Sequence, residues 1–216
     1  MKEAANHNIP GLIIREEAPG DYRTVEEMTR EAFWNKYAPG CNEHYLVHVL
    51  RQDPGFRPWH SLVAEYDGHV IGHALLSPSE IELDAGGSLP VFTLGPLTVL
   101  PAVIRRGIGG SLMRGAIKLL KEQGASALML TGDPKYYHRF GFMSASLLGI
   151  RLHGVPPEEE AAYFMALPLY PGALDGKRGV CRFSPLFDIG ESPEFDTYDS
   201  GFPKREKLRL PGQLHQ

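Results

Sequence analysis

Cysteine is scarce in this chain, and other features that would define a function class are also missing. Cys41 and Cys181 are too few and too far apart for a disulfide framework or a zinc site, so we expect reduced thiols. No apolar run is long enough to cross a bilayer, and the start of the chain lacks the apolar core of a signal peptide. These absences predict a cytoplasmic protein with no membrane partner.

Neither basic nor acidic residues are in large excess. The chain holds 22 Lys and Arg against 26 Asp and Glu, a formal net charge of −4. Such a balance gives no global basic field, so we expect no nucleic-acid partner. Hydrophobic residues make up 43% of the 216 positions, which predicts a folded core. The length suits one large domain, or one domain with an extension.

An anion-binding loop is predicted over residues 99–112, where the sequence reads VLPAVIRRGIGGSL. A helix start leaves backbone N–H groups unpaired, and glycines let a phosphate approach them closely. Arginines add planar charged donors that fit phosphate oxygens. The loop has no P-loop lysine and lacks the third glycine of a dinucleotide fingerprint. A helix start whose glycines only turn the chain is the alternative.

A second motif, GDPKYYHRFGF, follows at residues 132–142, after an apolar segment that predicts a short buried strand. Pro134 stands at a favoured first-turn position, so a helix is expected to begin there. The two motifs together resemble the GNAT superfamily of acetyl-CoA-dependent N-acetyltransferases. The resemblance is specific over residues 94–142 and covers about 12–142 in element order. The segment GPLTVLP adds a likeness to a bacterial subgroup of predicted acetyltransferases.

The resemblance implies the fold class and the layout of the chain. It implies an α/β (α+β) GNAT fold, with a central mixed, mostly antiparallel sheet flanked by helices and splayed parallel strands that hold acyl-CoA. We expect an N-terminal tail at 1–10, an acetyltransferase core at 11–150, and a C-terminal strand and extension at 151–216 that pack on the core. Gly95-Pro96 inside a strand-like run fits the splay, because proline cannot donate to a ladder; an edge bulge is the alternative.

Periodicity predicts several elements around these motifs. A helix is expected over Ile108–Glu122, with Gly124 as its C-terminal cap. A hairpin is expected from the strands at 61–66 and 70–76, followed by a separate extended stretch at 81–83. Another helix is expected from Glu43 to Arg51, with its apolar residues on one face and His44 and His48 on another. Without acidic or cysteine ligands at a fixed spacing, we interpret these two as surface histidines and expect no metal.

The resemblance also implies which residues contact the cofactor. The strand whose backbone pairs with the pantetheine arm of acetyl-CoA matches Leu97, Thr98 and Val99. The loop and helix start that hold the pyrophosphate match Arg105, Arg106, Gly107, Ile108, Gly109, Gly110 and Ser111. The family usually has Gln or Arg where this chain has Ile104, so we expect altered but not abolished binding of the cofactor.

Catalytic residues are implied in the same way. Tyr137 matches the family's tyrosine near the thioester sulfur, and a phenol with a pKa of about 10 can protonate the leaving thiolate. A packed aromatic ring is the alternative. For the base that takes the proton of the amine, His73 is the candidate, because the ordinary pKa of histidine is near neutral. Glu43, Glu65 and a water molecule are its rivals.

The acceptor side is expected near the first two helices, which flank it in this family; the implied residues are Trp34, Tyr37 and His44. The predicted activity is transfer of an acetyl group from acetyl-CoA to a primary amine of a small molecule or protein, by direct attack on the thioester. A catalytically weak acyl-CoA sensor or interaction module is the alternative, and a nucleotide-binding module is a third possibility. The superfamily allows a homodimer. The acidic run at residues 188–199 predicts either a solvated face or one side of a pocket for a cationic acceptor.

Overall fold

The computed structural model describes residues 9–156, 158–190 and 192–213. Strands are β1 (Leu12–Glu16), β2 (Ser61–Tyr66), β3 (His69–Leu83), β4 (Ser88–Val99), β5 (Ala127–Thr131), β6 (Met143–Ser144), β7 (Ile150–Leu152), β8 (Phe164–Pro168) and β9 (Gly179–Arg182). Helices are α1 (Tyr22–Phe33), α2 (Glu43–Leu50), α3 (Ile108–Glu122), α4 (Pro134–Tyr137) and α5 (Pro193–Asp199). Most strand pairs are antiparallel and β4 pairs with β5 in parallel, so the predicted mixed, mostly antiparallel sheet is confirmed.

The described residues divide into two compact units. Unit A contains residues 9–75, 96–112 and 185–213, and unit B contains residues 76–95 and 113–184. The long elements β3, β4 and α3 each contribute residues to both units.

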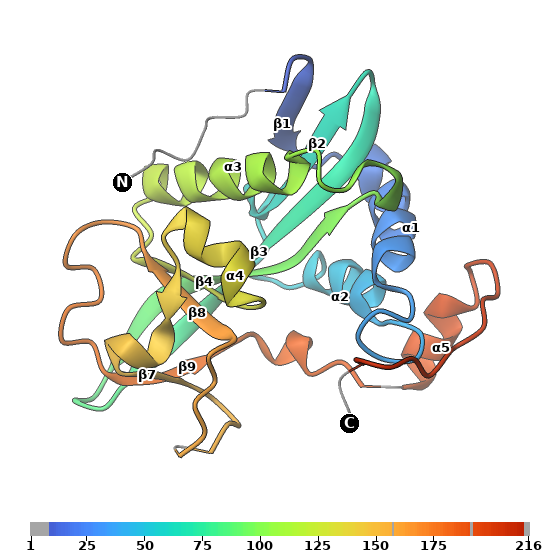
Figure 1. The fold of residues 1–216 in the computed structure, drawn as a ribbon. Coiled ribbons are helices and arrows are strands. Elements are labelled where there is room, and N and C mark those ends of the chain that lie inside the picture. Colours follow the sequence, from blue (N-terminus) through green and yellow to red (C-terminus); the bar gives the residue numbers. More distant parts are fainter. Residues whose placement is uncertain (1–8, 157, 191, 214–216) are drawn as a thin grey trace. The chain divides into compact units, whose positions relative to one another are not determined.

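Unit A is built on three antiparallel strands. β1 pairs with β2 from Leu12↔Tyr66 to Glu16↔Leu62, and β2 pairs with the first half of β3. Figure 1 shows these strands side by side. Helices α1 and α2 pack against each other, and Val25, Val47 and Val63 form a small buried cluster. The cluster shows that one apolar face of each helix is turned towards this part of the sheet.

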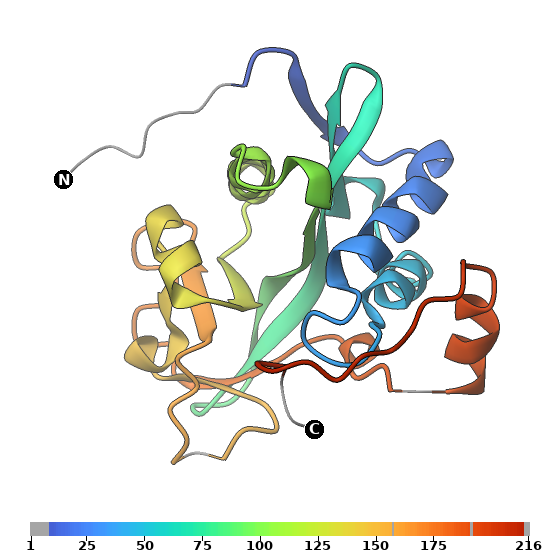
Figure 2. The same cartoon turned by 45° about the vertical axis from the view of Figure 1, so that its right-hand side comes forward.

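The C-terminal residues 185–213 also belong to unit A. The Arg30 guanidinium on α1 donates to Asp199 at the end of α5, with Nε and Oδ1 2.7 Å apart. The indole Nε1–H of Trp34 donates to the carbonyl of Glu206 over 3.0 Å. Figure 2 shows this red segment beside the blue helices α1 and α2. Side-chain bonds from α1 and the residues after it therefore hold the C-terminal segment in place.

Unit B has an apolar core. β5 is hydrogen-bonded to β4 in parallel and to β8 antiparallel, and β8 also pairs with β6. The second half of β3 pairs with β9, which pairs with β7. The buried cluster between these elements consists of Ile81, Val91, Ala127, Met129, Ala145, Ile150, Phe164, Ala166, Leu174 and Cys181. This composition is that of an ordinary hydrophobic core.

Two expectations about the elements have different outcomes. The predicted bounds of the helix α3 are confirmed, and Gly124 follows it with a φ of +70°, the left-handed conformation of a C-terminal cap. The separate extended stretch at 81–83 is wrong, because β3 runs unbroken from His69 to Leu83. Pro78 does not end the strand, since it lies at an exposed position where an extended backbone suits its fixed φ.

Candidate cofactor and catalytic site

The predicted anion loop lies in unit A, between the end of β4 and the start of α3. Arg105 and Gly107 have φ angles of 63° and 89°, so the chain turns through the left-handed region twice. Glycine tolerates this conformation, whereas an arginine there is uncommon. Arg105 and Arg106 are exposed, and neither forms an ion pair with another described residue. Two cationic side chains are therefore left available at this turn.

The first turn of α3 supplies backbone donors to the same place. The amide of Ser111 donates to the carbonyl of Gly107 over 3.0 Å, which is the first helical hydrogen bond. The amides of Ile108, Gly109 and Gly110 precede that bond and point out of the helix end. With the helix dipole and the two arginines, they form a site suited to a phosphate or pyrophosphate group. Ile104 is 54% exposed beside this loop, so a longer polar side chain would have room there.

The predicted pantetheine strand is the last part of β4. Thr98 is buried, and its hydroxyl oxygen lies 3.2 Å from that of Thr29 on α1. The amide of Leu100 donates to the carbonyl of Ile71 over 3.0 Å, which fixes this end of β4 on β3. Upstream, the parallel register joins Phe92 to Leu128 and Thr93 to Met129, and β4 then continues to Val99. A parallel ladder this short is what the predicted splay requires.

Tyr137 lies in unit B, at the end of the short helix α4. The carboxylate of Asp133 caps this helix by accepting from the amide of Lys135 over 2.9 Å. A Cβ at Gly132 would lie 2.3 Å from the Tyr137 ring, so the glycine of the motif is needed for the ring to pack there. The ring is half-buried and makes an edge contact with Phe142, at a centroid distance of 5.8 Å. The motif therefore fixes the position of the phenol within unit B.

His73 lies in unit A, on β3, and has no exposed surface. Its Nε2 is 2.8 Å from the Ser61 hydroxyl, and its Nδ1 has no hydrogen-bond partner among the described residues. Burial, followed by the charge of Arg51, lowers the pKa of His73 well below 6.5, so the ring is neutral at physiological pH. β3 and β4 are joined by a short turn and run antiparallel, so the bond between Leu100 and Ile71 places Thr98 across from His73.

The two rival carboxylates have different surroundings. Glu65 on β2 accepts a hydrogen bond from Arg15 Nε over 2.7 Å, so it is engaged in an ion pair. Glu43 is the first residue of α2, and burial raises the pKa of its carboxyl group. A raised pKa makes a carboxylate a better base, so Glu43 stays a rival to His73.

The comparisons with known proteins agree with this geometry. The model of the acetyltransferase (GNAT) family matches residues 24–142, which include the anion loop and the tyrosine motif. The chain belongs to the GNAT family.

Relatives of this GNAT protein match most of its length. The Escherichia coli proteins YhbS and YjhQ, both described as uncharacterized N-acetyltransferases, are 30% and 31% identical to it over 82% and 79% of this chain, and 99% and 91% of their own. The crystal structure of YhbS in complex with CoA has a TM-score of 0.71 and covers 82% of this chain and 92% of its own. A GNAT acetyltransferase from Brucella melitensis in complex with acetyl-CoA is 34% identical, with a TM-score of 0.65 and coverage of 82% and 98%.

The residues expected on the acceptor side of this GNAT protein differ in exposure. Tyr37 is 43% exposed, whereas Trp34 is half-buried and stacks under the Arg30 guanidinium, 4.0 Å from its ring centroid. His44 is fully buried, so its interpretation as a surface histidine is wrong. Its Nε2 lies 2.9 Å from Asp199 Oδ1, and its ring packs edge-on against Phe202. The periodicity of α2 alone could not show that α5 and the residues after it cover this side of the helix.

Cys41 completes a cluster that has the order of a thiol triad. Its Sγ is 3.6 Å from Nδ1 of His44, which in turn contacts Asp199. Burial raises the pKa of the Cys41 thiol well above its usual value, so a nucleophilic thiolate does not form. Arg30 also holds both oxygens of Asp199. The cluster therefore ties α5 to α1 and α2 and does not activate a thiol.

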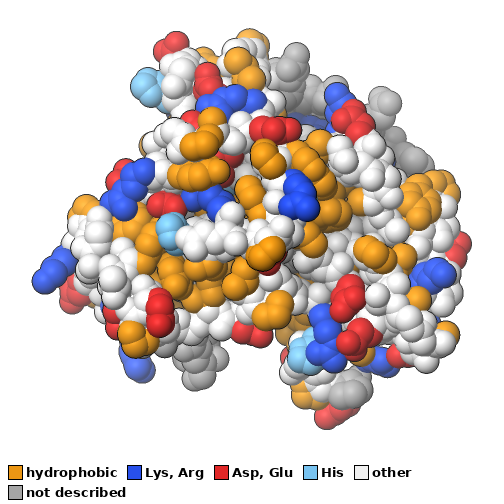
Figure 3. Space-filling model, turned by 180° about the vertical axis from the view of Figure 1, so that it is seen from behind, with side chains coloured by type: hydrophobic (Ala, Val, Ile, Leu, Met, Phe, Trp, Pro, Cys, Tyr) orange, Lys and Arg blue, Asp and Glu red, His pale blue; other side chains and the backbone are white. Residues whose placement is uncertain are grey.

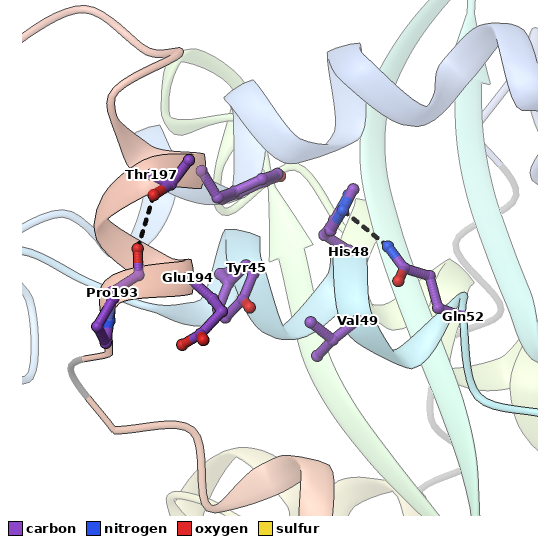
Figure 4. Close-up of a pocket in the computed structure, with 8 residues that line it drawn as sticks. Tyr45, His48, Val49, Gln52, Pro193, Glu194 and Thr197 are labelled. Carbon is purple, nitrogen blue, oxygen red and sulfur yellow. Dashed lines mark hydrogen bonds between the residues drawn. The ribbon is translucent and has the colours of Figure 1, made fainter.

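A surface groove of about 430 Å³ lies between α2 and α5 in unit A. Figure 4 shows Tyr45, His48, Val49 and Gln52 on one side, and Pro193, Glu194 and Thr197 on the other. Of the acidic run at 188–199, Glu194 lines the groove, whereas Asp199 is engaged by Arg30. On the face in Figure 3, acidic and basic side chains are scattered among hydrophobic ones.

Metal sites and membrane-spanning helices are two further features that the described residues could contain. Within these residues, no group of three or more His, Cys, Asp and Glu side chains could hold a metal ion. Within the same residues, no helix is long and apolar enough to cross a membrane.

The buried polar group around His73, made of Glu17, Arg51 and Ser61, has no signature along the sequence. Glu17 follows β1, Ser61 begins β2 and Arg51 follows α2, and none belongs to a local motif. Arg51 donates to the carboxylates of both Glu17 and Glu26, and its side chain is 5% exposed. These residues are brought together by strand register and by helix packing, so no pattern along the chain could identify them.

Proposed function

We propose that this GNAT protein transfers an acetyl group from acetyl-CoA to a primary amine of a small molecule or protein. The observation that carries the proposal is the start of α3, where the amides of the first helical turn lie beside two exposed arginines that form no ion pair with any described residue. The solved relatives that contain CoA and acetyl-CoA support the same cofactor. In this proposal, Arg105 to Ser111 bind the pyrophosphate, and the backbone of Leu97 to Val99 pairs with the pantetheine arm.

The reaction is a direct attack of the amine nitrogen on the thioester carbon. The new C–N bond forms as the C–S bond breaks, and a backbone N–H of Leu97–Val99 stabilises the oxyanion. The hydroxyl of Tyr137 gives its proton to the leaving thiolate. His73 is the proposed acceptor of the proton of the amine, because its neutral ring carries a lone pair on Nδ1, which has no hydrogen-bond partner among the described residues. The acceptor side includes Trp34, Tyr37 and His44. Because His44 is buried, it contributes by holding α5 in place through its contact with Asp199.

The test is the release of free thiol from acetyl-CoA across a panel of amines. Tyr137→Phe should lower kcat by about 100-fold or more, since general acid catalysis contributes 10²–10⁴, and should leave the affinity for CoA nearly unchanged. Tyr136→Phe is the matched control, because its ring packs against Tyr137 at 4.9 Å and it has no assigned role. Binding of acetyl-CoA without turnover of any amine would contradict the enzyme and favour the acyl-CoA sensor.

A thermal-shift assay separates this cofactor from the nucleotide-binding alternative. A ligand that binds only the folded protein raises its melting temperature, and the rise grows with the logarithm of the ligand concentration relative to Kd. CoA should stabilise the protein, whereas ATP and NAD should not. We further propose a cytoplasmic location, supported by the two free cysteines, Cys41 and Cys181. A homodimer is left for a measurement of mass in solution.

A further inference from the structure

Three buried side chains in unit A, those of Glu17, Ser61 and His73, are joined in series by hydrogen bonds. The Ser61 hydroxyl donates to Glu17 Oε2 over 2.7 Å, and the Ser61 hydroxyl oxygen lies 2.8 Å from His73 Nε2. Ser61 and His73 have no exposed surface, and Glu17 is 6% exposed. Water therefore does not compete for these bonds, and the protons in them must be shared among the three side chains and Arg51.

The number of protons decides the direction of each bond. Arg51 donates from Nε and Nη2 to the two oxygens of Glu17, which is therefore a carboxylate and has no proton to give. The single hydroxyl proton of Ser61 lies towards Glu17, so Ser61 must accept at its contact with His73. In the opposite arrangement, two oxygens would face each other at 2.7 Å with no proton between them.

We propose that Ser61 and Glu17 are positioning residues that hold His73 as the Nε2–H tautomer and leave the lone pair on Nδ1. Neutral imidazole carries one N–H, so a proton on Nε2 makes Nδ1 the acceptor. Nδ1 is a buried atom with no hydrogen-bond partner among the described residues, and His73 lies at a strand position across from Thr98. The role of this lone pair as the base rests on the proposed acetyl transfer, whereas the tautomer itself does not.

The tautomer can be read directly by ¹⁵N NMR of the His73 ring in the full chain. The wild-type protein should show a protonated Nε2 and an unprotonated Nδ1 at neutral pH. Ser61→Ala should remove the preference and give a mixture of tautomers, while Ser61→Thr, which keeps the hydroxyl, should restore the wild-type spectrum. Ser77→Ala is the matched control: Ser77 is also a buried serine, it lies on β3 as His73 does, and its hydroxyl donates to the Pro78 carbonyl.

Kinetics then connect the tautomer to the reaction. Ser61→Ala should lower kcat by roughly 10-fold, a part of what general base catalysis contributes, with KM for acetyl-CoA within about twofold. Ser61→Thr should recover most of this loss. A wild-type ring protonated on Nδ1, or an unchanged kcat in a Ser61→Ala protein with mixed tautomers, would overturn the inference. A wild-type protein with the Nε2–H tautomer and no turnover contradicts the proposed function and still supports the positioning by Ser61 and Glu17.

Discussion

The two units differ in what they bury. The core of unit B is apolar, and its buried polar residues are the neutral Ser77 and Thr93. Unit A buries charged and titratable groups, among them Glu17, Glu26, Arg30, His44, His60 and His73. Buried charges are costly unless they are paired and hydrogen-bonded. Unit B is therefore stabilised by apolar burial and positions Tyr137 within its fold, whereas unit A also buries charged groups at a cost in stability.

Removing the charge of Arg51, which pairs with the buried carboxylates of Glu17 and Glu26, should have the largest effect on the free energy of unfolding. Arg51→Met leaves the carboxylates of Glu17 and Glu26 buried without their partner, so the free energy of unfolding should fall by about 3–5 kcal/mol. The control is Lys118→Ala, whose exposed pair with Glu122 should be worth less than about 0.5 kcal/mol. Both are measured by urea denaturation. Equal losses in the two variants would remove the distinction between buried and exposed charge.

A large-to-small change in unit B should affect stability alone. Met129 is fully buried in the apolar cluster, so Met129→Ala should cost about 2–5 kcal/mol through lost transfer energy and a cavity. The affinity for CoA of the folded fraction, measured by calorimetry, should stay within about twofold. A much weaker affinity would show that the binding of CoA depends on the packing of the apolar core of unit B.

The buried histidines of unit A should make its stability depend on pH. Burial lowers the pKa of His44 and of His60 from 6.5 to about 4. Between pH 4 and 6.5 the unfolded chain therefore binds more protons, and stability falls as the pH falls through this window. Each histidine contributes about 1.4 kcal/mol per pH unit. His44→Gln should reduce this slope, while His69→Gln, at an exposed position, should leave it unchanged.

The smallest effect is expected at Ile104, where the family usually has Gln or Arg, and it concerns the affinity for CoA. Ile104→Arg adds a cation beside Arg105, so CoA should bind about 2–5-fold more tightly, a gain of roughly 0.5–1 kcal/mol typical of an exposed charge pair. The gain should disappear at high salt. Ile13→Arg is the matched control, because Ile13 is also 54% exposed and lies on β1. An equal gain from both variants would indicate nonspecific attraction.

The sequence allowed the local parts of this account to be predicted. The bounds of α3 follow from the spacing of its apolar residues and from Gly124. The start of the short helix that carries Tyr137 follows from Asp133 and Pro134. The buried state of His44 could not be predicted, because residues more than 150 positions away cover it. The contact of Ser61 with Glu17 likewise joins residues 44 positions apart. Helices and turns can be predicted from short sequence patterns, whereas the buried polar group depends on how segments distant in the sequence pack together.

In the proposed reaction, the start of α3 binds the pyrophosphate of CoA. The most direct test is a titration of the ¹⁵N-labelled protein with CoA, followed through the backbone amide resonances. The account predicts saturable shifts that are largest at Ile108, Gly109 and Gly110. Saturable binding of CoA that leaves these three amides unchanged, with the largest shifts elsewhere, would contradict it.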